Sequence, residues 1–115
     1  GDLNVAPLEA DVWDHKKLLR VVSHTPIEVA HMDAWYASHD WVDAVRHFVP
    51  EDERLFSWWS YRSPNWENAD KGRRLDHIWV TPALVPDLCG VEVFKPARGY
   101  SPASDHAPVI VELEI

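Results

Sequence analysis

The sequence predicts one layered domain of the α/β or α+β class, in which helices and strands are mixed along the chain. Two observations support this prediction: a capped helical pattern follows residue 25, and apolar residues alternate along the last seven residues. The length of 115 residues fits a single domain, and no repeat, linker or internal boundary divides the chain. We therefore treat residues 1–115 as one unit.

Residues 5–26 are predicted to form a long loop with one short helical turn, and a helix is expected over about residues 26–39. Thr25 supplies a capping hydroxyl, Pro26 suits the first helical position and Glu28 completes a capping box. Apolar residues recur at helical spacing and predict a stripe that faces the core. They are Ile27, Val29, Ala30, Met32, Ala34, Trp35, Tyr36 and Ala37.

Strands are predicted over residues 56–61, 74–80, 91–94 and 109–115, with an exposed loop at 62–72 and a capped helical turn at 82–88. In the second of these strands, alternation puts Asp76 on the same face as Ile78 and Val80. A carboxylate on an apolar face is costly unless it is paired. Asp76 is therefore expected to have a polar partner.

Composition limits the possible functions. Eleven Lys and Arg against 19 Asp and Glu give a net charge of -8, which disfavours non-specific binding of polyanions. Neither a membrane span nor a signal peptide is recognisable, so no membrane partner is expected. Cys89 is the only cysteine, which excludes a disulfide within the chain and favours a reducing, cytoplasmic location. The histidines at 15, 24, 31, 39 and 47 lack the spacing of a zinc helix.

Three short segments carry carboxylate, amide or imidazole groups where a strand meets a loop. They are Gly1-Asp2-Leu3-Asn4, Arg74-Leu75-Asp76 and Ser104-Asp105-His106-Ala107-Pro108. Oxygen ligands of this kind suit Mg²⁺ or Mn²⁺, and such a cation beside Asp, Asn and His favours hydrolysis of a phosphate ester. Each segment alone also has a structural interpretation: a turn, an ion pair of Asp76 with Arg74, or an Asx turn.

Taken together with Trp41-Val42-Asp43-Ala44-Val45-Arg46 and Phe56-Ser57-Trp58-Trp59-Ser60-Tyr61-Arg62, the three segments resemble the exonuclease III family of abasic-site endonucleases. This family belongs to the endonuclease/exonuclease/phosphatase superfamily. The resemblance implies a DNase I-like, two-sheet α/β (α+β) sandwich with outer helices. It also implies that residues 1–115 are the C-terminal half of a single domain, with no internal boundary.

The resemblance implies roles for residues of all three segments. Asp2 would activate water or protonate the leaving group, Asn4 would stabilise the phosphate, and Asp76 would orient His106 on the scissile phosphate. Asp105 would bind Mg²⁺ or Mn²⁺, and Asp2, Asn4 and His106 would line a possible second metal position. The catalytic set is thus Asp2, Asn4, Asp76 and His106, and the metal-binding set is Asp105, Asp2, Asn4 and His106.

The resemblance also implies a substrate: duplex DNA with an abasic site or a 3′ end, in base excision repair. Trp58, Trp59 and Leu75 would line a pocket for a flipped abasic sugar. One of the adjacent tryptophans is expected in the core and the other at the site. Arg62, Arg73 and Arg74 are expected to contact phosphates. Arg73 departs from the family, which usually has tryptophan or leucine at this pocket wall.

Three functional residues of the family, an asparagine, a glutamate and a tyrosine, lie upstream of Gly1 and have no counterpart in the chain. The fragment alone is therefore expected to be inactive and to depend on the missing N-terminal half. The intact protein is expected to be a monomer of the bacterial cytoplasm. Alternative functions are a superfamily phosphatase or ribonuclease, and a non-catalytic DNA-binding relative.

Overall fold

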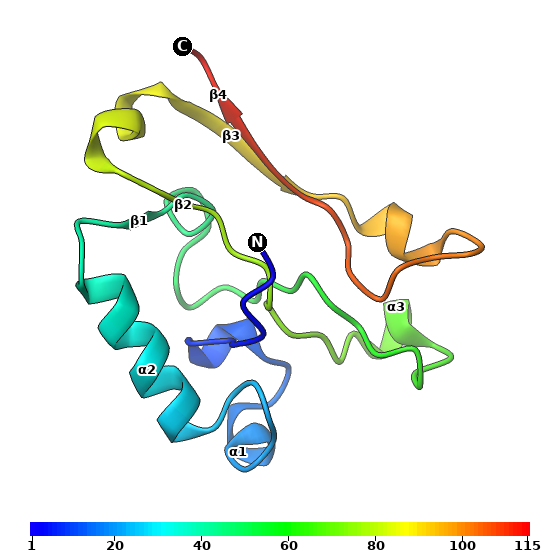
Figure 1. Ribbon diagram of the computed structural model, residues 1–115. Helices are drawn as coiled ribbons and strands as arrows, with labels where there is room; N and C mark the ends of the chain where they lie inside the picture. The colour runs from blue at the N-terminus through cyan, green and yellow to red at the C-terminus, as the bar shows by residue number, and fades with distance from the viewer.

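The computed structural model describes all 115 residues, and Figure 1 shows the arrangement of its elements. Three short helical turns of the 3-10 type connect the other elements, at Glu9–Asp11, Pro82–Asp87 and Lys95–Gly99. The α-helices are α1 (His15–Leu18), α2 (Pro26–Ala37) and α3 (Trp66–Ala69), and the strands are β1 (Val42–Asp43), β2 (Trp79–Val80), β3 (Leu88–Val93) and β4 (Val109–Leu113). No helix is long and apolar enough to span a membrane.

Helix α2 begins where the sequence predicts. The Thr25 hydroxyl donates to Glu28 Oε2 at 2.7 Å, and the Thr25 N–H donates to the same oxygen at 3.1 Å, so the capping box is formed. The prediction that its apolar stripe faces the core is wrong. Only Met32 is buried, while 68% of Ile27 and 53% of Trp35 are exposed. The helix lies at the edge of the molecule (Figure 1). Its Trp35 packs edge-on against Trp79.

The centre of the chain consists of extended segments joined by isolated backbone bridges. Asp2 pairs with Asp76, Val12 with Arg73, and Trp58 with both Arg73 and His106. The Ser57 and Trp58 N–H groups both donate to the Arg73 carbonyl, at 2.9 and 3.0 Å, which is the two-against-one pattern of a β-bulge. This irregular pairing explains why the strands predicted at 56–61 and 74–80 are regular only at β2.

Two antiparallel pairs, β1–β2 and β3–β4, are the regular sheets of the chain. In the second pair Val91 lies opposite Val111 and Val93 opposite Val109. The predicted strands at 91–94 and 109–115 are therefore confirmed with shifted bounds. Figure 1 shows this hairpin extending to one side, away from α2.

The apolar core is small and divided. Only 21 of the 115 residues are buried, and most of the apolar ones belong to three separate groups. These groups are Ala6, Val12, Leu18 and Leu75; Ala44, Val80 and Leu88; and Phe56, Trp59 and Ala107. The centre also contains buried charges, since Asp11 is fully buried and Arg74 is 2% exposed. Polar contacts therefore contribute to holding the segments together.

Candidate active site

The three polar segments meet at the bridged centre of the fold. The pairing of Asp2 with Asp76 aligns the first segment with the second, and the pairing of Trp58 with His106 brings in the third. Potential ligand atoms of Asp2, Asp76 and His106 all lie within 4.8 Å of one another. The structure therefore gathers groups that are separated by up to 104 positions in the sequence.

His106 is held by Asp76. The distance from His106 Nδ1 to Asp76 Oδ2 is 2.8 Å, so the ring donates to the carboxylate through Nδ1 and turns Nε2 towards Asp2. This contact provides the polar partner predicted for Asp76. The alternative ion pair between Asp76 and Arg74 is not formed, because Arg74 binds Asp11 and Asp43.

Two carboxylates beside the histidine each have one oxygen fixed and one oxygen directed to the ring. Asp2 Oδ1 accepts from the Asn4 N–H at 3.0 Å, and Asp2 Oδ2 lies 3.7 Å from His106 Nε2. Asp105 Oδ2 accepts from Trp58 Nε1 at 3.0 Å, and Asp105 Oδ1 lies 3.9 Å from the same nitrogen. Two oxygens and one nitrogen thus converge at the surface.

The surrounding charges favour the protonated form of His106. Partial burial lowers the pKa of the imidazole, but the hydrogen bond to Asp76 and the charges of Asp76, Asp2 and Asp105 outweigh it. The pKa of His106 is consequently raised above its ordinary value. A protonated ring can donate from Nε2 to an anionic oxygen.

Ser57 is a site residue that the sequence analysis missed. Its hydroxyl donates to Asp76 Oδ2 at 2.6 Å and accepts from the N–H groups of Leu75 and Asp76 at 3.1 and 3.2 Å. The side chain is fully buried. Ser57 therefore fixes the same oxygen that orients His106. The only sequence signal was its place in the aromatic segment, which gave no reason to select it.

Asp2, Asp76 and His106 are the groups whose potential ligand atoms all lie within 4.8 Å of one another, close enough to bind one cation. Asp105 is not part of this set, although its Oδ1, like Asp2 Oδ2, is free of hydrogen bonds within the chain and lies 3.9 Å from His106 Nε2. Carboxylate oxygens of this kind suit Mg²⁺ or Mn²⁺. Asn4, the remaining predicted ligand, is exposed and has a left-handed φ of 55°, a conformation that asparagine tolerates.

The adjacent tryptophans separate as the strand alternation predicts. Trp59 is 2% exposed and packs in the core with Phe56 and Ala107, so it is not available to substrate and its predicted contact with DNA is corrected. Trp58 is half-buried and lines an open cavity of about 880 Å³ together with Leu75. Arg62 and Arg73 line the same cavity.

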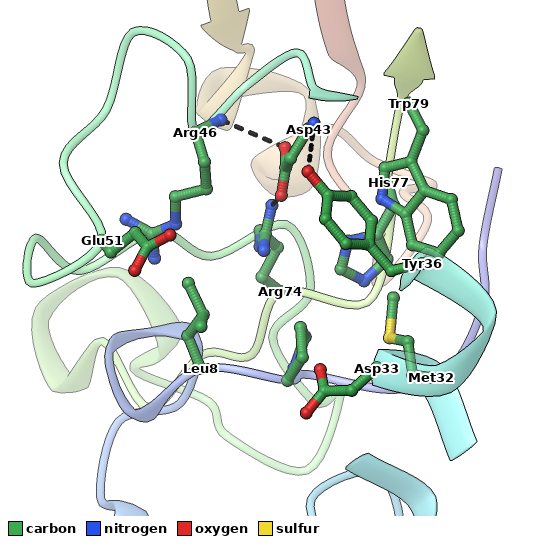
Figure 2. Close-up of a pocket in the computed structure, with 11 residues that line it drawn as sticks. Leu8, Met32, Asp33, Tyr36, Asp43, Arg46, Glu51, Arg74, His77 and Trp79 are labelled. Atoms are coloured by element: carbon green, nitrogen blue, oxygen red, sulfur yellow. Dashed lines mark hydrogen bonds and ion pairs between the residues drawn. The ribbon is translucent and has the colours of Figure 1, made fainter. Parts of the chain in front are cut away.

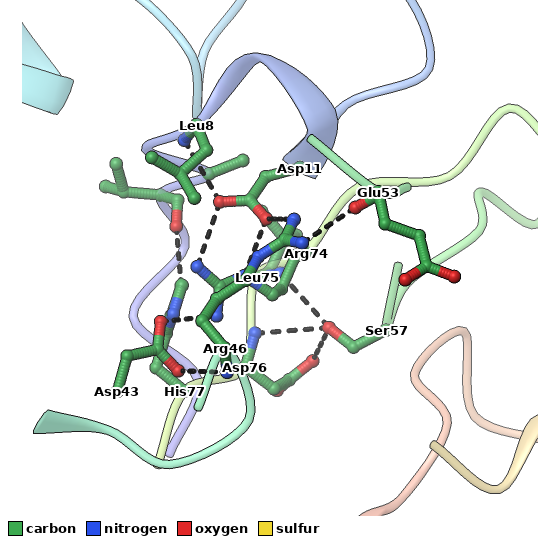
Figure 3. Close-up of polar contacts among 12 residues, drawn as sticks. Leu8, Asp11, Asp43, Arg46, Glu53, Ser57, Arg74, Leu75, Asp76 and His77 are labelled. Carbon is green, nitrogen blue, oxygen red and sulfur yellow. Dashed lines mark hydrogen bonds and ion pairs between the residues drawn. The ribbon is translucent and has the colours of Figure 1, made fainter. Parts of the chain in front are cut away.

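The phosphate contact predicted for Arg74 is also corrected. Arg74 is 2% exposed, and its guanidinium contacts Asp11 at 2.8 Å and Asp43 at 2.7 Å. Figure 3 shows these bonds, together with the pair that Arg46 makes with Asp11 at 2.7 Å. Burial lowers the pKa of Arg74, but the two carboxylates outweigh it and the pKa is raised. Arg74 is therefore part of a buried ion-pair network and not of a surface that could contact DNA.

A second, smaller cavity of about 140 Å³ lies beside this buried network (Figure 2). Met32 and Tyr36 of α2 line it, and the Tyr36 hydroxyl accepts from the Asp43 N–H at 3.0 Å. Its arginines, Arg46 and Arg74, are already paired with carboxylates. None of the convergent catalytic groups lines this cavity.

The mixed α/β fold brings carboxylates and a histidine together, an arrangement that suits enzymes which hydrolyse phosphate esters. Residues 1–106 match the endonuclease/exonuclease/phosphatase family, and the chain belongs to that family. Solved structures agree with this assignment. An AP endonuclease from Archaeoglobus fulgidus superposes with a TM-score of 0.94 at 27% identity, covering 100% of this chain and 44% of that one.

Two other proteins are similar over the whole length of the chain. Exodeoxyribonuclease III of Haemophilus influenzae is 31% identical over an alignment of length 123, which covers 99% of this chain and 44% of that protein. The 3′ phosphatase NExo from Neisseria, bound to a product DNA hairpin, has a TM-score of 0.90 at 30% identity, covering 100% of this chain and 44% of that one. The predicted exonuclease III resemblance and DNase I-like fold are confirmed. The chain spans less than half the length of these relatives.

Proposed function

We propose that residues 1–115 are the C-terminal half of a metal-dependent DNA phosphodiesterase domain. The intact enzyme would cleave duplex DNA 5′ to abasic sites and remove nucleotides from 3′ ends, as part of base excision repair. The main support is the convergence of Asp2 Oδ2 and Asp105 Oδ1 on His106 Nε2, at 3.7 and 3.9 Å. The similarity to an exodeoxyribonuclease III and to an AP endonuclease supports the choice of substrate.

The proposed mechanism assigns one task to each side chain. Protonated His106, oriented by Asp76, would donate from Nε2 to an oxygen of the scissile phosphate. The free oxygen of Asp2 would accept a proton from the attacking water, or the protonated acid would donate to the leaving oxygen. Asn4 would stabilise the phosphate as its charge increases. Trp58 would hold Asp105 through the hydrogen bond to Oδ2.

Asp105 would hold Mg²⁺ or Mn²⁺, and Asp2, Asn4 and His106 would line a possible second metal position, where His106 would bind a cation only as the neutral imidazole and not while its Nε2 carries the proton. Such a cation supplies neutralisation of the charge that develops on the phosphate and a lower pKa for a bound water. Because the family's upstream asparagine, glutamate and tyrosine are absent from this chain, we propose that it has little activity alone. The intact enzyme would act as a monomer in the bacterial cytoplasm, where the exposed thiol of Cys89 would stay reduced.

A second candidate activity is removal of a phosphate from a DNA 3′ end. It is favoured by the similarity to the Neisseria 3′ phosphatase. The same catalytic groups serve both reactions, since each one hydrolyses a phosphate ester. The two differ in what occupies the cavity beside Trp58: a sugar without its base in one case, and the end of a strand in the other.

The test is cleavage of a duplex oligonucleotide with one synthetic abasic site, with Mg²⁺ or with EDTA. The chain is assayed alone and joined to the upstream half of its domain, which we call the complete domain. We expect cleavage only by the complete domain, only with Mg²⁺, and not by its Asp105→Ala variant. Cleavage by the 115-residue chain alone would contradict the proposed role of the upstream residues. No cleavage by either protein would favour a phosphatase on another substrate or a non-catalytic relative.

A further inference from the structure

The cavity beside Trp58 concentrates positive charge in an acidic chain. Arg62, Lys71 and Arg73 line it, whereas its lining includes no aspartate or glutamate. None of the three cations forms a salt bridge with a carboxylate of the chain. The chain as a whole has a net charge of -8, so this local excess of cations is opposite to the average. An anion is the ligand that such a cavity favours.

Arg73 is the most constrained of these cations. Its Nη1 donates to the Val22 carbonyl at 3.0 Å and to Ser23 Oγ at 2.9 Å, and its guanidinium lies 5.1 Å from the centre of the Trp58 ring. Its Nε is buried without a partner. Partial burial lowers the pKa of Arg73, and no acidic group offsets this effect. The guanidinium is thus preorganised and partly desolvated without a counter-charge.

Trp58 connects this cation to the catalytic groups. One part of its side chain stacks on Arg73, and its ring N–H donates to Asp105 Oδ2 at 3.0 Å. The backbone of Trp58 pairs with both Arg73 and His106. A group bound at Arg73 therefore lies one side chain away from the groups that would hold the reacting phosphate.

We propose that this cavity is a subsite for a second phosphate of the DNA strand, and that Arg73 is its principal contact. The inference rests on the proposed function and refines it, because the pocket wall is cationic where the family resemblance implied an apolar one. A planar guanidinium held on an aromatic face suits hydrogen bonding to phosphate oxygens. The phosphate is either the backbone phosphate next to the reacting one or a phosphate at a 3′ end.

The experiment replaces single phosphates by neutral methylphosphonates. Duplexes with an abasic analogue carry one such replacement at each position around the lesion, and their affinity for the complete domain is measured in EDTA, where no cleavage takes place. At one position we expect the replacement to weaken wild-type binding about tenfold, as for loss of one charged hydrogen-bonded contact. For the Arg73→Leu variant, the same replacement should lower the affinity less than about twofold, because the contact is already lost.

A duplex with a 3′-terminal phosphate distinguishes the two sources. We call a phosphate coupled to Arg73 when its loss weakens binding by the wild type but not by Arg73→Leu. If the subsite binds the terminal phosphate, removal of that phosphate shows this coupling and the internal replacements do not. Coupling at an internal position instead assigns the subsite to the backbone.

Three variants control for folding and for general charge. Arg73→Lys retains the charge and should retain part of the coupling, whereas Arg73→Gln should lose it. Arg20→Leu removes an exposed arginine outside the cavity and should leave the coupling intact. Equal losses for wild type and Arg73→Leu with every duplex would overturn the inference while leaving the proposed function standing. A wild-type protein that neither binds nor cuts DNA would refute both.

Discussion

Two charged clusters include the sequence neighbours of Leu75, Arg74 in one and Asp76 in the other. The two clusters balance their charges differently. In the first, the carboxylates of Asp11 and Asp43 face the guanidinium groups of Arg46 and Arg74. Figure 3 shows the contacts of this network, in which Asp11 is fully buried. Its positive and negative charges are equal in number, so it requires no ligand.

The second cluster has three carboxylates, those of Asp2, Asp76 and Asp105, around the single ring of His106. It is open to solvent, since Asp2 is exposed and the other members are half-buried. The excess of negative charge favours a bound cation. We infer that the balanced cluster stabilises the fold and that the unbalanced cluster is used for chemistry.

The largest effect expected is on catalysis, in the open cluster. His106→Asn removes the Nε2 donor, and cleavage of abasic DNA by the complete domain should fall about 10²–10⁴-fold. Its free energy of unfolding should change by less than about 1 kcal/mol, because the ring is partly exposed. Initial rates under Mg²⁺ and denaturant titrations measure the two quantities. Full activity of the variant would remove His106 from the proposed mechanism.

The next effect is on stability, in the buried cluster. Asp11→Asn leaves the guanidinium groups of Arg46 and Arg74 without their shared counter-charge, which should cost about 3–5 kcal/mol in the complete domain. Glu9→Gln is the matched control, since the Glu9 side chain is 80% exposed, and should cost less than about 0.5 kcal/mol. If the two variants unfold at the same denaturant concentration, the network does not have the role assigned to it.

A smaller effect is expected at Ser57, which supports Asp76 in the open cluster. Ser57→Ala removes the hydroxyl that fixes Asp76, and we expect kcat to fall about 10–100-fold with little change in KM. Ser38→Ala is the control, because the exposed Ser38 hydroxyl donates only to the Trp35 carbonyl at the end of α2, outside the cavity. A larger change in KM than in kcat would argue for substrate binding, against positioning.

The smallest effect expected is the pH dependence of stability through His77. Burial lowers the pKa of His77, and the charge of Arg74 lowers it further, so the unfolded chain binds this proton more readily than the folded one. Stability from this source is present above about pH 6.5, the ordinary histidine value, and is lost as the pH falls below it. The free energy of unfolding, measured by denaturation at pH 7.5 and at pH 5.5, should fall more between these two values for wild type than for His77→Gln.

His106 contributes with the opposite sign, because its pKa is raised. Its stabilisation is present at low pH and is lost as the pH rises through the raised value. Since both proteins retain His106, comparing wild type with His77→Gln removes this contribution. A larger loss in His77→Gln would contradict the assignment to His77.

Local signals predicted local structure. The capping box of Thr25 and Glu28 gave the start of α2, and alternation gave β4, because these patterns depend on neighbours within a few residues. The pairing of Asp76 with His106 could also be anticipated. A carboxylate in an apolar strand needs a partner, and the family resemblance supplied one.

Long-range register could not be predicted in this way. Arg74 meets Asp11 across 63 positions, and nothing near either residue indicates the contact. For that reason Arg74 was expected at the surface. The stripe of α2 was expected to be buried because periodicity identifies one apolar face without saying what covers it. The contact of Ser57 with Asp76 could not be predicted either, because Ser57 lies in a β-bulge opposite Arg73 that no local pattern indicates.

The contrast between the clusters is tested most directly by one matched pair of variants in the complete domain. Asp11→Asn makes the same chemical change in the buried cluster as Asp76→Asn makes in the open one. For each variant, the free energy of unfolding and the rate of abasic-site cleavage are measured under native conditions. We expect Asp11→Asn to lose stability while its folded fraction still cuts DNA, and Asp76→Asn to remain stable but to lose at least about 100-fold in rate. Equal losses of stability and of rate in both variants would contradict the separate roles of the two clusters.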